Sequence, residues 1–278
     1  GGLLGDYDPL FVIRNISAAK LATMREEAIA IRGIRDEYLN EFVAFEGTQN
    51  FLNSLQNYSL LRGTQSNLYK CFLPQAWNIG TNFGVSGFLH PEGVYDDPNG
   101  GILREEIYPR LRYHFQFQNE LKLFADIGNR NKFGINIYSN VQSGCFENIS
   151  NLFHPNTVDA SFNHFGSGLC DGVKDEDDQW NLKGHRSRIV NINEDTLRLF
   201  ANLYDETGTP THQARLPVVH SQQVIEVLRK FAKHPHRLGD LKEQYFSTEM
   251  WHETNAQEDG TVKRSTQYPG TPKNWILS

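Results

Sequence analysis

Apolar positions in the first part of the chain recur at three- and four-residue steps. Ser17 precedes a run in which Leu21 and Ala28 share one face with aromatic residues further along, and charged residues fill the positions between. Side chains at this spacing lie on one face of an α-helix, so the pattern predicts an amphipathic helix that Ser17 caps and that ends near Gly47. A coiled coil is the alternative. Arg35 interrupts its seam, so packing within one domain is favoured.

The next part of the chain alternates between helical and strand-like patterns. Apolar runs mark strands, and three- to four-residue spacing marks helices. The predicted elements are a helix from Ser66 with Leu68, Cys71, Phe72 and Ala76 on one face, a strand from Phe83 to Leu89, a helix from Ile102 to Tyr113 that Pro109 bends or shortens, and strands from Leu121 to Ile127 and from Lys132 to Tyr138.

The pattern changes after residue 143. From Gly144 to Gly184 glycine, asparagine, serine and aspartate dominate, which predicts a connecting region with short elements. Helices are predicted again after Asn193 and Ser221, and the last thirty residues look irregular. The chain is therefore expected to hold an α/β domain over residues 1–143 and a helical and irregular connector over residues 144–278.

Composition places few limits on function. The 278 residues carry a formal charge of −6, which argues against a nonspecific nucleic-acid binder but allows a local basic patch. Cys71, Cys145 and Cys170 are too widely spaced for a zinc knuckle or a disulfide framework. No apolar run approaches the roughly 20 residues that span a bilayer, and no signal peptide is recognisable, so a cytoplasmic location is expected.

The common enzyme motifs are either incomplete in this sequence or absent from it. The pair at 252–253 resembles the start of a zinc-protease helix, but the second histidine is replaced by Ala256. The Gly-Ser-Gly at 166–168 lacks the spacing of a nucleophile elbow, and the acidic run at 175–178 lacks the alternation and glycine of a calcium loop. No phosphate-binding loop and no dinucleotide glycine motif occurs.

Several segments taken together resemble the later motifs of adenine-specific DNA methyltransferases, above all the large methylases of type IIG restriction-modification and phage-defence systems. The resemblance covers residues 1 to about 140. It rests on the segments Asp6 to Arg14, Ser66 to Leu73, Gly87 to Tyr95, Leu103 to Glu105, Leu121 to Phe124 and Lys132 to Tyr138.

The resemblance implies the C-terminal part of a Rossmann-like methyltransferase sheet followed by a mainly helical connector toward a target-recognition domain. In the family a mixed seven-stranded sheet binds S-adenosylmethionine and receives an adenine flipped out of double-stranded DNA. Methyl is transferred directly to the adenine amine, without a metal.

The family's catalytic Asn/Asp-Pro-Pro-aromatic tetrapeptide and its donor-binding motif are absent from this sequence. The chain thus resembles a fragment that begins just after the tetrapeptide. The 278 residues alone are expected to be inactive and to need the remainder of the methylase polypeptide. A nuclease domain or subunit is a further expected partner, although nothing in this sequence resembles one.

The resemblance also assigns site residues. The family's base-stacking aromatic corresponds to Phe124, with Phe133 as second choice; the alternative is that both rings are core residues on adjacent strands. Stacking on a base contributes roughly 1 to 3 kcal/mol. Asn67, Tyr69 and Phe72 match the helix that lines the cofactor and base pocket.

Candidate DNA contacts begin at a predicted strand end, where open α/β sheets build ligand sites. His90 and Glu92 lie there, and the alternative for His90 is a polar loop residue. The loop from Tyr95 to Gly101 is longer than a simple turn requires, which makes it a further candidate. Phosphate contacts are expected from basic residues, for each of which a solvated surface position is the alternative. These are Arg104, Arg110, Arg112, Arg130, Lys132, Arg186 and Arg188.

Two other functions compete with a methyltransferase. The first is a nonenzymatic DNA-binding or assembly module that keeps the sheet as a scaffold, and the missing donor motif favours it. The residues encoded directly before Gly1 discriminate the two, because only the enzyme needs the tetrapeptide there. The second is a hydrolase using His90 or His185, for which no nucleophile is found.

Overall fold

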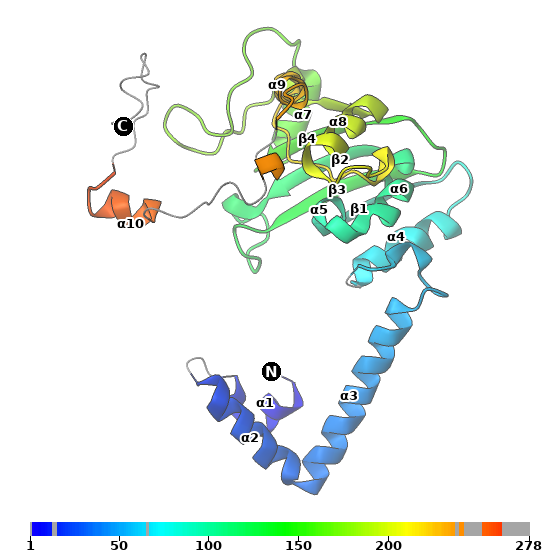
Figure 1. The fold of residues 1–278 in the computed structure, drawn as a ribbon, viewed down its shortest axis with the longest axis vertical. Helices are drawn as coiled ribbons and strands as arrows, with labels where there is room; N and C mark the ends of the chain where they lie inside the picture. The colour runs from blue at the N-terminus through cyan, green and yellow to red at the C-terminus, as the bar shows by residue number, and fades with distance from the viewer. Residues whose placement is uncertain (1, 13–15, 65–66, 237–238, 242–251, 263–278) are drawn as a thin grey trace. The chain divides into compact units, whose positions relative to one another are not determined.

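The computed structural model describes residues 2–12, 16–64, 67–236, 239–241 and 252–262 (Figure 1). Ser66, the expected start of the second helix, and most of the last thirty residues lie outside these ranges. The chain divides into two compact units, Gly1–Lys233 and His234–Ser278. In the second unit α10 (Glu253–Glu258) begins after His252, whose side chain accepts a hydrogen bond from the backbone N–H of Asn255.

The N-terminal amphipathic segment forms two helices where one was predicted. After α1 (Leu3–Tyr7) and the short 3-10 helix η1 (Pro9–Phe11), α2 spans Ala18–Ala30 and α3 spans Arg32–Asn53. The Ser17 hydroxyl accepts from the N–H of Lys20, which confirms the predicted cap. The break lies at Ile31, whose backbone is extended. Ile31 and the nearby Gly33 both have low helix propensity, which weakens the helix at this point.

Helix α4 (Leu68–Ile79) follows η2 (Ser59–Leu61) and buries a different face from the one predicted. Cys71 is buried as expected, but Leu68 and Phe72 are exposed, and Lys70 is buried. Lys70 is tolerated on the buried face, beside Leu73 and Trp77, because its ammonium lies 3.1 Å from the Asp97 carboxylate. A periodicity of apolar residues does not reveal a buried lysine.

Five strands form a mixed sheet. They are β1 (Val85–Pro91), β2 (Leu111–Gln118), β3 (Lys132–Ser139), β4 (Cys145–Leu152) and β5 (Val190–Asn193), in the order β1-β3-β2-β4-β5. β3 is antiparallel to both of its neighbours, β2 is parallel to β4, and β5 is antiparallel to β4. β1, β2 and β4 therefore run in one direction, and their carboxyl ends lie at the same edge of the sheet.

Helical elements connect the strands. In chain order they are α5 (Gly93–Asp96), η3 (Pro98–Gly100), α6 (Gly101–Arg110), η4 (Asn119–Leu121), α7 (Asn156–Asn163), η5 (Arg186–Arg188), α8 (Glu194–Tyr204), η6 (Thr211–Gln213) and α9 (Gln222–Ala232). The Asn193 side chain accepts from the N–H of Thr196, so the predicted cap of α8 is confirmed. α9 begins after Ser221 as predicted.

Pro109 shortens α6, which was one of the two effects expected of it, and the strand predicted between α6 and β3 was wrong. Pro109 lacks an N–H for the carbonyl of Glu105, and α6 ends one residue later, so the helix does not reach Tyr113. The strand predicted at 121–127 is a loop in which Lys122 adopts left-handed φ (54°). The strand that precedes β3 and pairs with it is β2, which lies about ten residues before the predicted strand.

The segment expected to be a connecting region carries part of the sheet. Residues 145–152 form β4, hydrogen-bonded to β2, and residues 190–193 form β5. Asn148 and Ser150 are buried on β4, which explains why the segment resembles a loop in sequence. The sheet thus continues past residue 143, while a functional division there stays a prediction.

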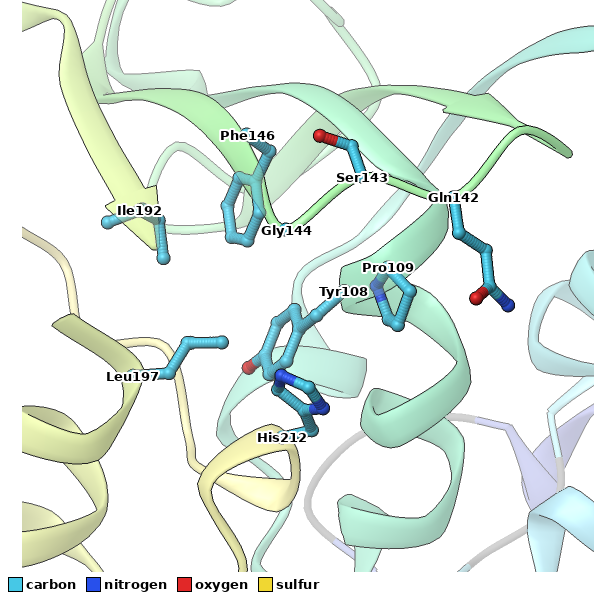
Figure 2. Close-up of a pocket in the computed structure, with 9 residues that line it drawn as sticks. All are labelled: Tyr108, Pro109, Gln142, Ser143, Gly144, Phe146, Ile192, Leu197 and His212. Atoms are coloured by element: carbon cyan, nitrogen blue, oxygen red, sulfur yellow. The ribbon is translucent and has the colours of Figure 1, made fainter. Parts of the chain in front are cut away.

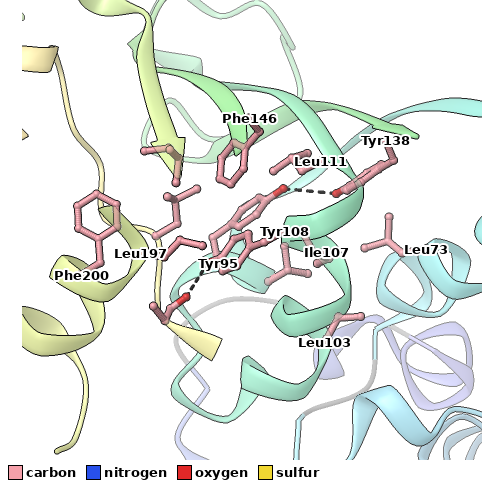
Figure 3. Close-up of a cluster of buried hydrophobic side chains, with 14 of the residues drawn as sticks. Leu73, Tyr95, Leu103, Ile107, Tyr108, Leu111, Tyr138, Phe146, Leu197 and Phe200 are labelled. Carbon is pink, nitrogen blue, oxygen red and sulfur yellow. Dashed lines mark hydrogen bonds between the residues drawn. The ribbon is translucent and has the colours of Figure 1, made fainter. Parts of the chain in front are cut away.

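Apolar side chains pack on both faces of the sheet. The larger cluster joins Leu111, Tyr138 and Phe146 of the strands to helices α4, α5, α6, α8 and α9 (Figure 3). The smaller one places Phe117, Ile149 and Leu152 against α7. The expected α/β character of the fold is therefore present, with helices on both faces.

None of the helices in the described ranges is both long and apolar enough to cross a bilayer.

Candidate functional site

A row of polar side chains crosses the middle of the sheet. The row consists of Asn136, His114 and Asn148, which are direct partners on β3, β2 and β4, and Phe88 on β1 pairs with Asn136 at its end, so these side chains share one face. Asn136, His114 and Asn148 are fully buried there. The row lies near the midpoint of β1, β2 and β4, because Phe88, His114 and Asn148 are each the fourth residue of their strand.

Glu92 covers this polar row from the turn after β1. Both of its carboxylate oxygens lie 3.1 Å from Nε2 of His114, and Nδ1 of His114 lies 2.6 Å from Oδ1 of Asn148. Asn148 in turn donates to the Ser150 hydroxyl at 3.0 Å. The carboxylate fits because residue 134 is glycine: a Cβ at Gly134 would overlap Oε1 of Glu92.

Four aromatic rings form a continuous series from α4 to His114, the histidine that Glu92 contacts. Tyr69 stacks on His90 with 5.2 Å between centroids, Tyr95 lies 6.2 Å from His90, and Tyr95 lies 4.4 Å from His114. The Tyr95 hydroxyl also donates to Asn136 at 2.5 Å. The stack therefore joins α4 and α5 to the sheet edge with defined geometry.

His90 is held as a neutral ring. Its Nδ1–H donates to the Pro91 carbonyl at 2.8 Å, and its Nε2 accepts from the Tyr138 hydroxyl at 3.1 Å. Burial lowers the pKa of His90, and the effects of the Pro91 carbonyl and of Glu92 only partly oppose this. Burial also raises the pKa of Tyr69, Tyr95 and Tyr138, so these phenols stay protonated.

An apolar pocket of about 480 Å³ lies at the same edge of the sheet. Its lining residues are Leu89, His90, Pro91, Phe124, Ile127, Asn131, Lys132 and Phe133. Phe124 and Phe133, the two predicted stacking residues, meet at 82° with centroids 5.0 Å apart. One face of Phe133 is stacked on Phe117, whereas Phe124 is 37% exposed. Phe124 is therefore the more accessible ring.

Asn119 fixes the loop that carries Phe124. Its buried side chain donates to the carbonyls of Phe124 (2.8 Å) and Ile127 (2.9 Å), and its Oδ1 accepts from the N–H of Phe124 (2.9 Å). The backbone N–H of Asn119 also bonds to the carbonyl of Asn131 at 3.0 Å, which closes the loop at its base. Phe124 thus occupies a defined place although its loop has no regular structure.

The predicted cofactor-binding residues lie on α4. Tyr69 reaches the site through its stack on His90. Phe72 is 58% exposed and Asn67 is exposed at the start of the helix, where its side chain makes no capping bond. Only Tyr69 among the three is in ring contact with His90.

Four of the predicted phosphate-binding arginines have structural contacts instead. Arg104 is buried and donates to the carbonyls of Val94, Asp97 and Gln213; Arg188 is buried and donates to those of Ser150, Asn151 and Lys183. Arg110 pairs with Glu106 and lies 4.9 Å from the centre of the Trp77 ring. Arg112 donates to the carbonyls of Pro109 and Leu111.

The remaining basic candidates are accessible. Arg130, Lys132 and Arg186 are exposed, and Lys132 is at the edge of the apolar pocket. The predicted DNA-contacting loop at 95–101 is compact, since it forms the end of α5 and η3, with Tyr95 buried and Asp97 paired with Lys70. Asp96, Pro98 and Asn99 are its exposed residues.

A second cavity, of about 330 Å³, lies between α6, the start of β4, α8 and η6 (Figure 2). Tyr108 and Phe146, stacked at 5.7 Å, form part of its wall, and Leu197 and His212 approach them from the α8 and η6 side. None of the site residues predicted from sequence lines it.

Within the ranges that the structure describes, no three histidine, cysteine, aspartate or glutamate side chains gather as a group that could hold a metal ion.

Sequence reasoning did not identify His114, Gly134, Asn136, Asn148 or Asn119. The first four converge only through strand register, which the sequence of β2 and β4 did not reveal. Asn119 carried a local signal, because asparagine side chains often bond to nearby backbone groups where strands end.

Comparison with known proteins gives no relative: no protein-family model matches the sequence, and no curated protein matches it.

Proposed function

We propose that this chain forms the target-base side of an S-adenosylmethionine-dependent DNA adenine-N6 methyltransferase of a restriction-modification or phage-defence system. The observation that carries the proposal is the apolar pocket beside the strand ends, in which Phe124 is both accessible and fixed in place. The motif resemblance over residues 1 to about 140 supplies the reaction.

The geometry favours Phe124 over Phe133 as the stacking residue. One face of Phe133 is occupied by Phe117, so it has less aromatic surface to offer a base. Phe124 meets Phe133 edge to face, and its backbone N–H and carbonyl both bond to the Asn119 side chain, which also donates to the Ile127 carbonyl. A flipped adenine needs a flat apolar surface, and stacking on one ring contributes roughly 1 to 3 kcal/mol.

The sheet supports this proposal at a coarser level. It is mixed, it has helices on both faces, and its parallel strands end beside the pocket. These features agree with the fold expected from the resemblance. They also occur in other α/β proteins, so the pocket and the motifs carry more weight.

Phosphate contacts in this proposal come from Arg130, Lys132 and Arg186. Arg104 and Arg188 are not assigned to phosphate binding, because both side chains are buried and their guanidinium groups donate to backbone carbonyls. Lys132 at the pocket edge and Arg130 two residues before it would position the DNA backbone near the flipped base. In this proposal S-adenosylmethionine is bound mainly by residues outside these 278, and Tyr69 lies next to the bound donor.

A nonenzymatic DNA-binding or assembly module is the second candidate. The exposed cations Arg130, Lys132 and Arg186 would serve it equally well, because binding DNA requires no methyl donor. Sequencing of the coding region directly before Gly1 separates the two: an Asn-Pro-Pro-aromatic tetrapeptide there supports the enzyme, and a start codon or an unrelated domain supports the module.

Methylation mapping tests the proposed function. The gene, with its complete coding region, is expressed in bacteria that lack adenine methylation, and N6-methyladenine is mapped by sequencing native DNA. We expect methylation at one recognition sequence, its loss in Phe124→Ala, and its retention in Phe231→Ala, which removes an exposed ring on α9. Unmethylated DNA from the wild-type strain would contradict the proposal.

A further inference from the structure

One face of the long helix α3 carries a seam with exposed apolar side chains at its centre. The positions of the seam recur at alternating steps of three and four residues, the spacing at which two helices pack side by side. They are Arg32, Arg35, Leu39, Phe42, Glu46 and Gln49. Leu39 and Phe42 are 45% and 50% exposed, and the adjacent Val43 is 66% exposed. The seam therefore presents apolar surface in its middle and polar side chains toward both ends.

The short helix α1 packs beside this seam without covering it. Leu3 and Leu4 of α1 line a groove together with Tyr38, Phe42 and Phe45 of α3. Leu39 and Val43 do not line that groove, and Phe42 keeps half of its surface exposed. The contacts of α1 thus lie along one flank of the seam.

The charges of the seam are separated along α3. Arg32 and Arg35 precede the apolar centre, and Glu46 follows it. No ion pair joins Arg35 or Glu46 to another of the residues that the structure describes. A parallel helix of the same sequence would place Arg35 against its own copy, whereas an antiparallel one reverses the order of the charges. The seam is therefore complementary to itself only in the antiparallel direction.

A single antiparallel register satisfies the seam. When Leu39 lies opposite Phe42 of a second copy, Arg35 lies opposite Glu46, because both pairs are centred between residues 40 and 41. The same centre places Arg32 opposite Gln49. A two-fold axis at this point repeats every contact, so each apolar centre is flanked by opposite charges on both sides.

We propose that α3 pairs antiparallel with α3 of a second copy of this chain, through Leu39 and Phe42 and through two ion pairs between Arg35 and Glu46. The inference goes beyond the proposed function, since it requires neither DNA nor a methyl donor. Arg35 interrupts the seam of a coiled coil when one helix is considered alone, and the antiparallel register gives this charge a partner. One helix pair is a small interface, so the dissociation constant is expected to be on the order of 10 μM.

Sedimentation velocity of the complete polypeptide, over protein concentrations on the order of 1 to 100 μM, measures the association. Arg35→Glu places like charges opposite each other at both ion pairs, and so does Glu46→Arg. Each single variant should therefore associate with itself at least about tenfold more weakly than the wild type. An equal mixture of the two should form a heterodimer with about the wild-type affinity, because every substituted charge then meets its opposite.

A matched variant controls for the change of charge. Glu37→Arg alters an exposed carboxylate on the opposite side of α3, so the dimer should form as in the wild type. Circular dichroism should give the same helix content for all these variants, since none of the substituted side chains is buried.

Three results would overturn the proposal. A wild-type protein that stays monomeric at every concentration would assign the seam to another segment of the complete polypeptide. Self-association that persists unchanged in both single variants would place the dimer contact elsewhere. Monomeric single variants whose mixture also fails to associate would exclude this antiparallel register.

Discussion

Gly134→Ala should destabilise the protein through Glu92, although the substitution introduces only one methyl group. The new Cβ would overlap Oε1 of Glu92 and lie 3.0 Å from Nδ2 of Asn136 and 3.2 Å from Nε2 of His114. The carboxylate end is the group that can move, so it should leave His114. Since His114 is only 2% exposed, water cannot fully replace the lost partner.

The magnitude follows from two opposing effects. Loss of a partner for a buried polar group costs about 1 to 3 kcal/mol. Replacing a glycine whose φ is not left-handed restricts the unfolded chain and returns about 0.4 to 1 kcal/mol. Gly134→Ala should therefore lower the free energy of unfolding by about 1 to 2 kcal/mol, and Glu92→Ala by about 1 to 3 kcal/mol.

A double-mutant cycle measured by equilibrium urea unfolding tests this mechanism. If the methyl group acts by displacing the carboxylate, Gly134→Ala should cost no more than about 0.5 kcal/mol once Glu92 is already alanine. Circular dichroism at neutral pH gives the four free energies, and an unchanged dependence on urea shows that the unfolded states are comparable. Costs that simply add, within about 0.5 kcal/mol, would refute the proposed contact.

Three further predictions concern His90, Asn119 and the cysteines. Burial lowers the pKa of His90, so the unfolded chain binds a proton at this residue more readily than the folded protein does, and the resulting stabilisation is complete above the unfolded pKa and is lost as pH falls. Urea unfolding between about pH 7.5 and about pH 5.5 should therefore show a smaller loss of unfolding free energy in His90→Asn than in the wild type, and equal losses would contradict this prediction. Asn119→Ala removes three hydrogen bonds from the loop that carries Phe124, so a protease should cut within residues 120–130 of this variant much faster than within the same residues of the surface variant Asn129→Ala. Equal cleavage rates would contradict the described geometry of the loop. Cys145 is exposed, whereas burial shields Cys71 and raises the thiol pKa of both Cys71 and Cys170. A thiol reagent should therefore modify Cys145 first, as mass spectrometry would show, and rapid labelling of Cys71 would contradict its buried position.

Elements with local signals were predictable from the sequence. Ser17 and Asn193 cap the helices that follow them, because a capping side chain needs only its own neighbours. β3 was found because its apolar alternation is bounded by polar residues. The end of α6 follows Pro109, whose effect on the helix was expected, whereas the break at Ile31 depended on weaker preferences that a continuous apolar pattern concealed.

The site was less predictable because its parts meet through register. β2 and β4 direct buried histidine and asparagine side chains to one face, so both resembled non-strand segments. Arg104 and Arg188 appeared to be surface cations, since a sequence does not show which carbonyl groups will surround a guanidinium. Phe124 was singled out by the resemblance, and the structure adds that Asn119 positions it.

Extrusion of the target adenine by the complete protein is the most direct measurement. With 2-aminopurine at the mapped target, fluorescence should rise on binding of the wild-type protein and of Phe231→Ala, and should rise much less with Phe124→Ala, while S-adenosylmethionine binding measured by calorimetry stays nearly unchanged in all three. Undiminished fluorescence with Phe124→Ala would contradict the assignment of this pocket to the flipped base.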